Sequence, residues 1–166
     1  MKKVLLLTGL VFFVFSCINA QEKPSIDSLE SRIETLEGED RASALYELVH
    51  HYLRVDRSRA RKYFDESREY NENESPAILA YAYMAQGIYH NRNGLLDSAV
   101  YYLEKARVQA EPADGHQPHI RTLAALAHTY ISSGKAEKGL EYLYTALRIV
   151  SEHPDQEMEL KLRTNI

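Results

Sequence analysis

Histidines are the side chains in this sequence whose type and spacing come closest to a chemical site. His116 and His119 follow Asp114 closely, so one short segment carries three side chains that can bind a metal ion. Pro118 limits how the two imidazoles converge, and histidines exposed to solvent in a loop are the simpler interpretation. We therefore expect no metal site.

No other pattern indicates catalysis. His50 and His51 would point about 100° apart on a helix, so we expect at most one of them to face any given site. A Gly-rich phosphate loop, a Gly-x-Ser-x-Gly elbow and a His-Glu-x-x-His motif are all absent from the sequence. The single cysteine, Cys17, lies in an apolar N-terminal segment, so the rest of the chain has no cysteine nucleophile or zinc knuckle. We expect a protein that is not an enzyme and holds no cofactor.

The N-terminal segment has the arrangement of a secretory signal peptide. Lys2 and Lys3 precede an apolar run over residues 4–15, and small and polar residues follow. The run is shorter than the roughly 20 apolar residues that span a membrane. We favour cleavage after Ala20. The alternative is a bacterial lipobox that would acylate Cys17. Both routes predict export to the periplasm or cell envelope of a bacterium.

The charge balance argues against nucleic acid as a partner. The chain has 24 acidic and 20 basic residues, and its formal net charge is −4 at pH 7. Binding to a phosphate backbone depends on clustered Lys and Arg, whereas the positive charges here are scattered. We expect a protein or peptide partner, with membrane attachment only through a lipid on Cys17 or a C-terminal segment missing from this sequence.

Helical periodicity dominates the sequence after residue 23. Apolar residues recur every three or four positions, which is the spacing of a helix face, and no alternating strand pattern is present. A first short helix is expected between a cap at Ser25 and a stop at Gly38. Four apolar residues would share its buried face: Ile26, Leu29, Ile33 and Leu36.

The remaining sequence repeats itself. The phrase GLLDSAVYYLEKARV begins at Gly94 and recurs as GKAEKGLEYLYTALRI from Gly134. A third copy, DRSRARKYFDESREY, contains Ala60, which precedes Ala99 by nearly the same spacing. Each copy reads as helix, tight turn, helix, and the repeat length is about 40 residues. Because a glycine inside a helix costs about 1 kcal/mol, Gly139 predicts a close contact between two helices.

The repeated positions carry a recognisable pattern. In the clearest copy, large and small packing residues and a turn glycine occupy Leu123, Leu126, Ala127, Tyr130, Gly134, Gly139, Leu143 and Ala146. This pattern resembles the tetratricopeptide repeat, although the copies here are longer than the roughly 34 residues usual in that family. The second copy departs from it at Gln86 and His90, and the first has Asp56 in place of the turn glycine. The resemblance implies an all-α fold, a solenoid of antiparallel helix pairs with three repeats and the start of a fourth.

The predicted organisation has four parts. They are a signal peptide (1–20), an N-terminal helix and linker (21–39), three repeats (40–74, 75–115 and 116–152) and the truncated first helix of a fourth repeat (153–166). Natural solenoids end in polar capping helices, and none follows here. We therefore interpret the chain as a fragment.

The resemblance also implies a concave groove lined by the first helix of each repeat. Mapped onto this chain, the groove residues are Tyr46, His50, Arg54, Tyr81, Met84, Ile88, Arg92, Arg121 and His128. Aromatic residues, Met and Arg are enriched at protein interfaces. Tyr46, Met84 and Ala124 replace the Lys and Asn that grip acidic chaperone tails in this family, so we do not expect that activity.

Two functions follow from this interpretation. The preferred one is an exported, non-catalytic scaffold that binds a protein or peptide along the concave face. The alternative is the N-terminal input region of a bacterial signal-transduction protein, either a histidine kinase or a helix-turn-helix regulator. A third interpretation concerns the groove itself, some of whose residues could instead pack against the N-terminal helix or a missing fourth repeat.

Overall fold

Helices are the only regular secondary structure in the described part of the chain. A computed structural model describes residues 25–113 and 116–152, so the predicted signal peptide (1–20) and the start of a fourth repeat (153–166) lie outside the described residues. No strand occurs in the described ranges, which confirms the all-α class. The helices are α2 (Ile26–Arg32), α3 (Gly38–Val55), α4 (Arg57–Ser67), α5 (Pro76–Arg92), α6 (Leu96–Ala110), α7 (Gln117–Ser132) and α8 (Ala136–Glu152).

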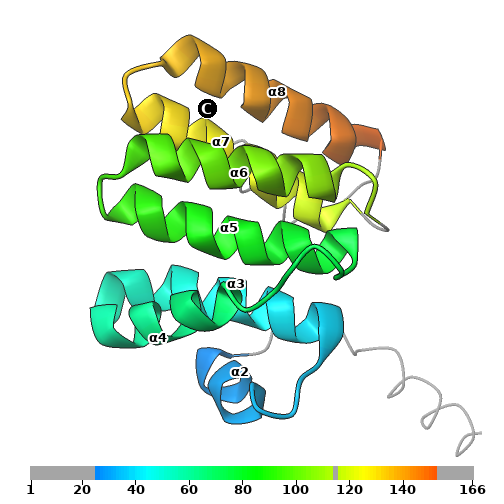
Figure 1. The fold of residues 1–166 in the computed structure, drawn as a ribbon. Coiled ribbons are helices and arrows are strands. Elements are labelled where there is room, and N and C mark those ends of the chain that lie inside the picture. Colours follow the sequence, from blue (N-terminus) through cyan, green and yellow to red (C-terminus); the bar gives the residue numbers. More distant parts are fainter. Residues whose placement is uncertain (1–24, 114–115, 153–166) are drawn as a thin grey trace, which may run out of the picture.

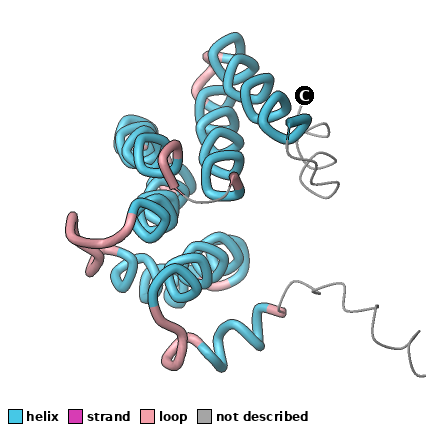
Figure 2. The backbone as a smooth tube through the Cα atoms, turned by 90° about the vertical axis from the view of Figure 1, so that its right-hand side faces the viewer, coloured by secondary structure: helices cyan, strands magenta, loops and turns pink. Residues whose placement is uncertain are grey.

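Six of these helices form three consecutive pairs. α3 packs on α4, α5 on α6 and α7 on α8, and α5 also contacts both α3 and α7. Figure 1 shows the pairs stacked in chain order, with α2 below the first pair. The view turned by 90° in Figure 2 shows the pairs following an arc. The architecture is therefore repeat-like. None of the helices in the described ranges is long and apolar enough to cross a membrane.

The turns inside the pairs follow two designs. In the second and third pairs a glycine takes the left-handed conformation, with φ of 75° at Gly94 and 79° at Gly134. Such a conformation costs a side-chain-bearing residue energy that glycine avoids. In the first pair, Asp56 has an extended backbone instead, and its carboxylate accepts hydrogen bonds from the backbone N–H groups of Ser58 and Arg59 at 2.9 and 3.1 Å. A side-chain cap thus begins α4 where the other pairs use a glycine.

The helices of the second and third pairs approach closely at a glycine. A Cβ on Gly87 would lie 2.5 Å from Cγ of Leu103. A Cβ on Gly139 would lie 2.6 Å from Cγ1 of Ile131 and 2.9 Å from the carbonyl oxygen of Ala127. These distances leave no room for a methyl group without a shift. The predicted close helix contact at Gly139 is confirmed.

A pair of stacked rings recurs once in each helix pair. One ring comes from near the end of the first helix and the other from the second helix. Ring centroids lie 5.9 Å apart for Tyr52 and Tyr63, 5.2 Å for His90 and Tyr102, and 5.6 Å for Tyr130 and Tyr142. The replacement of tyrosine by His90 in the central copy therefore preserves the stacking.

The N-terminal helix packs as predicted but is shorter than expected. Leu29 and Ile33 are buried in the core, and Ile26 and Leu36 pack against it. The Ser25 hydroxyl accepts a hydrogen bond from the backbone N–H of Ser28 at 3.2 Å, which confirms the cap. The helix ends at Arg32 rather than at Gly38, because the chain turns before the linker; Gly38 instead begins α3 with φ of 54°.

A carboxylate on α2 holds this helix to the first pair. Glu30 accepts hydrogen bonds from the hydroxyls of Tyr52 and Tyr63 at 2.5 and 2.8 Å, and Arg59 lies 3.0 Å away. These hydrogen bonds, with a smaller contribution from the charge of Arg59, lower the pKa of the Glu30 carboxyl. Glu104 on α6 holds its helix to the third pair in the same way, because it accepts a hydrogen bond from the hydroxyl of Tyr142 on α8 at 2.5 Å. α2 therefore contributes to the first pair the contact that α6 contributes to the third.

Candidate functional site

The first helices of the three pairs share one surface. α5 packs between α3 and α7, and an ion pair joins the outer two: Nη1 of Arg121 on α7 lies 2.5 Å from Oε1 of Glu47 on α3. These residues are 74 positions apart in the chain. We call this surface the inner face and define it by the nine predicted groove residues together with Glu47 and Asn91. The ion pair shows that the arc is tight enough for the first pair to contact the third.

Four of the nine predicted residues form the floor of the inner face. Tyr46 and Tyr81 are 8% and 4% exposed, Met84 is fully buried and Ile88 is 9% exposed. The two tyrosine rings lie 6.2 Å apart, and the guanidinium of Arg121 lies 5.7 Å from the centre of the Tyr46 ring. Burial raises the pKa of both tyrosines. Packing within the chain occupies these side chains, so a partner has little access to them.

The exposed part of the inner face is basic and polar. His50, Arg54, Arg92 and His128 are exposed, and Arg121 is partly exposed. Arg54 and Arg92 form no ion pair with a carboxylate in the described ranges. The predicted residues thus divide into a buried, apolar floor and an exposed set rich in cationic and imidazole groups.

A polar link joins the second and third pairs on this surface. The side-chain amide of Asn91 donates to Oγ1 of Thr129 at 3.0 Å and lies 3.3 Å from Nδ1 of His128. Thr129 is buried, and its hydroxyl also donates to the carbonyl of Ala125 at 2.9 Å. The link orients His128 between α5 and α7.

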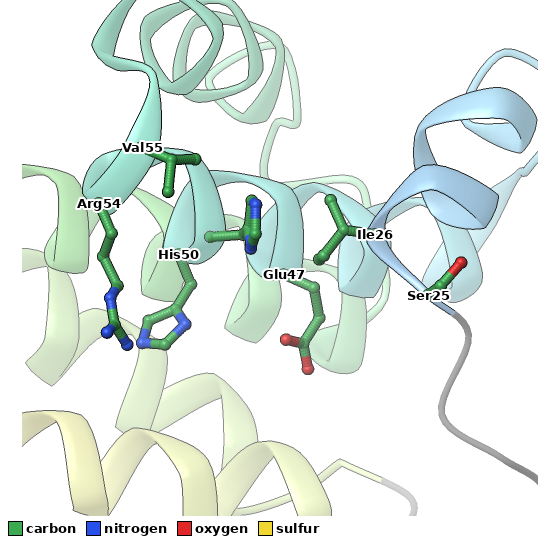
Figure 3. Close-up of a pocket in the computed structure, with 7 residues that line it drawn as sticks. Ser25, Ile26, Glu47, His50, Arg54 and Val55 are labelled. Carbon is green, nitrogen blue, oxygen red and sulfur yellow. The ribbon is translucent and has the colours of Figure 1, made fainter.

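A pocket of about 480 Å³ opens between α2 and the exposed side of α3. Figure 3 shows Glu47, His50 and Arg54 projecting from one side of α3 toward α7, with Ser25 and Ile26 at the start of α2 lying beyond Glu47. The pocket combines two imidazoles, a guanidinium, a carboxylate and apolar groups. Its lining residues are Ser25, Ile26, Glu47, His50, His51, Arg54 and Val55.

The two adjacent histidines both line this pocket, so the expectation that at most one could face a given site is wrong. Residues at spacings of three and four cover a stripe roughly 100° wide on a helix. His50 and His51 lie at the two edges of the stripe that contains Glu47 and Arg54. A shallow pocket along a helix can therefore reach both imidazoles.

The histidines in the linker do not gather into a metal site in the described part of the chain. His116 is exposed before α7 and His119 is partly buried, whereas Asp114 lies outside the described residues. Burial lowers the pKa of His119. No group of three or more His, Cys, Asp or Glu residues that could hold a metal ion occurs within residues 25–113 and 116–152.

Sequence reasoning missed Glu47, Asn91 and Glu30. Glu47 directly follows Tyr46 and Asn91 directly precedes Arg92, so a wider register on the first helices would have included both. Glu30 has no such signal, because the tyrosines that donate to it lie 22 and 33 positions away. Only the folded chain brings those groups together.

The chain was also compared with known proteins. No protein-family model, no curated protein and no solved structure matches it. The inner face is therefore interpreted from its own geometry and chemistry.

Proposed function

We propose that this chain is a tetratricopeptide-type solenoid that binds a protein or peptide segment on its inner face, without catalysis. Three helix pairs with equivalent ring pairs support the solenoid, since stacked repeats of this kind create extended concave surfaces. The N-terminal segment, which lies outside the described residues, has the composition of an export signal and supports a partner in the bacterial periplasm or envelope.

One observation carries the proposal. The ion pair of Glu47 and Arg121 brings the first helices of all three pairs onto one surface, and this surface still exposes Arg54 and Arg92 without a carboxylate partner in the described ranges. Arginine is enriched at protein interfaces because its planar guanidinium can make several hydrogen bonds at once. If every charged group of the inner face were already paired within the chain, a partner would find no charged group there to bind.

Site-specific photocrosslinking tests this function. A benzoylphenylalanine replaces His128, which is exposed on α7 within the inner face, in the full chain expressed with its own leader, and crosslinked products are identified by mass spectrometry. The control places the same group at Tyr101, which is 58% exposed on α6 and lies outside the inner face. We expect a defined protein to be captured from position 128 and not from position 101. Equal capture at both positions, or none at position 128, would contradict the proposal.

A further inference from the structure

Side chains of the three first helices form two rows in register with the stacked rings. Two residues before each first-helix ring lie His50, Ile88 and His128. Two residues after the same rings lie Arg54, Arg92 and Ser132. The second row places the two arginines at equivalent positions of the first two pairs. These positions are neighbours because α3 packs directly on α5.

These two arginines differ from most others in the described ranges. Arg41 pairs with Glu66 at 2.9 Å and Arg61 pairs with Asp65 at 2.7 Å. In an acidic chain with 24 carboxylate side chains, positive groups readily find partners. Arg54 and Arg92 have none among the described residues, although both lie on the surface proposed to bind a partner.

The pocket between α2 and α3 gives Arg54 a recessed site in which a group of the partner can bind. His50, His51 and Arg54 surround it on one side, while Ile26 and Val55 supply apolar surface. The one carboxylate in the lining, Glu47, is already held by Arg121. A guanidinium beside imidazole groups favours an anion, and its fork geometry matches a carboxylate.

We infer that the partner segment is an extended acidic peptide, one carboxylate of which enters this pocket at Arg54 while a second, three residues further along, reaches Arg92. The inference rests on the proposed function. Neighbouring packed helices lie about 8–10 Å apart. An extended chain in the polyproline II conformation advances about 3.1 Å per residue and has three residues per turn, so two residues three positions apart share a face and span that separation. Two acidic side chains at this spacing meet both arginines, whereas two adjacent acidic side chains do not span the separation.

Binding of synthetic peptides tests the inference. The full chain is expressed with its leader, and the purified protein is titrated with fluorescein-labelled Ser/Gly peptides of equal length. One peptide has two glutamates three positions apart, a second has the same two glutamates side by side in one block, and a third has glutamine at the two spaced positions. A fourth has phosphoserine at the two spaced positions. Fluorescence anisotropy gives the dissociation constants.

We expect the spaced glutamate peptide to bind at least about threefold more tightly than the block peptide, and the glutamine peptide to show no measurable binding. The double variant Arg54→Glu, Arg92→Glu should weaken binding of the spaced peptide at least about tenfold. Arg57→Glu is the matched control, because Arg57 is exposed at the start of α4 and does not line the pocket, and it should change binding less than twofold.

Several outcomes would overturn the inference. The glutamine peptide could bind as tightly as the spaced glutamate peptide, the phosphoserine peptide could bind more tightly than it, or the double variant could behave like the Arg57 control. No binding of any peptide, with continued crosslinking from position 128, would reject the acidic segment and leave the proposed function standing. Loss of crosslinking would reject the function itself. Circular dichroism of the double variant establishes that it folds.

Discussion

In both the second and the third helix pair, the two helices approach closely at a glycine. This glycine belongs to the first helix in the second pair and to the second helix in the third pair. In the second pair Gly87 of the first helix faces the second helix near Ala99, whose carbonyl oxygen would lie 3.4 Å from an added Cβ. In the third pair Gly139 of the second helix faces Ala127 of the first. The difference shows that the short distance between the helices belongs to the pair, since either helix can supply the residue without a side chain.

The two glycines differ in what surrounds them. Next to Gly87 lies Leu103, which is fully buried and whose Cγ and Cδ2 would lie 2.5 and 2.7 Å from an added Cβ. Next to Gly139 lies Ile131, which is 40% exposed and can rotate toward solvent. The carbonyl oxygen of Ala127 remains in the way at 2.9 Å. A buried side chain therefore limits the contact in the second pair, and the backbone limits the contact in the third.

The substitutions with the largest predicted effect on stability test this comparison. Gly87→Ala should lower the free energy of unfolding by about 2 kcal/mol, because the overpacking cost exceeds the gain of about 1 kcal/mol from removing a helical glycine. Gly139→Ala should cost a similar amount, since Ile131 can yield but the backbone carbonyl of Ala127 at 2.9 Å cannot. Urea unfolding followed by circular dichroism measures both, with Ser132→Ala on exposed surface as the control. A loss at either glycine no larger than that of the control would contradict the comparison.

The carboxylates that hold the first and third pairs offer a second comparison. Glu30 is near three donors, the hydroxyls of Tyr52 and Tyr63 and the guanidinium of Arg59. Glu104 accepts from the hydroxyl of Tyr142 and, at 2.8 Å, from Nε of Arg107. Glu30→Gln should destabilise by about 1–2 kcal/mol at pH 7, and Glu104→Gln should destabilise by less. The loss is larger for Glu30→Gln because three donors would then bond to a neutral amide oxygen in place of a carboxylate, compared with two donors at Glu104.

The pH dependence sharpens that comparison. Burial raises the pKa of Glu104, but hydrogen bonds from Tyr142 and Arg107 outweigh it and the pKa is lowered; the pKa of Glu30 is also lowered. A carboxyl with a lowered pKa in the folded state stabilises the protein fully above its unfolded pKa, about 4.3 for Glu. This stability is lost as the pH falls through the folded value. Each Gln variant should therefore lose less stability than the original protein between pH 6 and pH 3, and parallel curves would contradict this.

The smallest predicted effects concern the turns. Asp56→Gly should lower the free energy of unfolding by only a few tenths of a kcal/mol, because glycine is an acceptable N-cap residue. Gly134→Ala should cost about 1 kcal/mol, since φ of 79° is unfavourable for a residue with a Cβ. Thermal unfolding of both variants measures the difference. Equal losses would show that the first pair needs its side-chain cap as much as the third pair needs its glycine.

Much of the fold could be predicted from the sequence, because the interactions that define each helix pair are local. The turn at Gly134, the close contact at Gly139 and the ring of Tyr130 lie within one copy, and equivalent features recur in the copy before it. The end of α2 at Arg32 was the exception, since the linker after it has no repeated counterpart.

The candidate site was predicted less completely. Register placed all nine residues on the first helices, but it could not separate the buried Tyr46 and Met84 from the exposed Arg54 and Arg92. That separation depends on how closely α3, α5 and α7 pack, and no single copy contains this information.

The sequence by itself determined the helices, their pairing and the positions of the turns, since contacts between residues a few turns apart decide these features. Only the tertiary structure decided the curvature of the stack, which brings Glu47 against Arg121, and the packing of α2 on the first pair through Glu30. The physical reason is that curvature accumulates from small rotations at each helix contact. Its outcome appears only where side chains 74 positions apart meet.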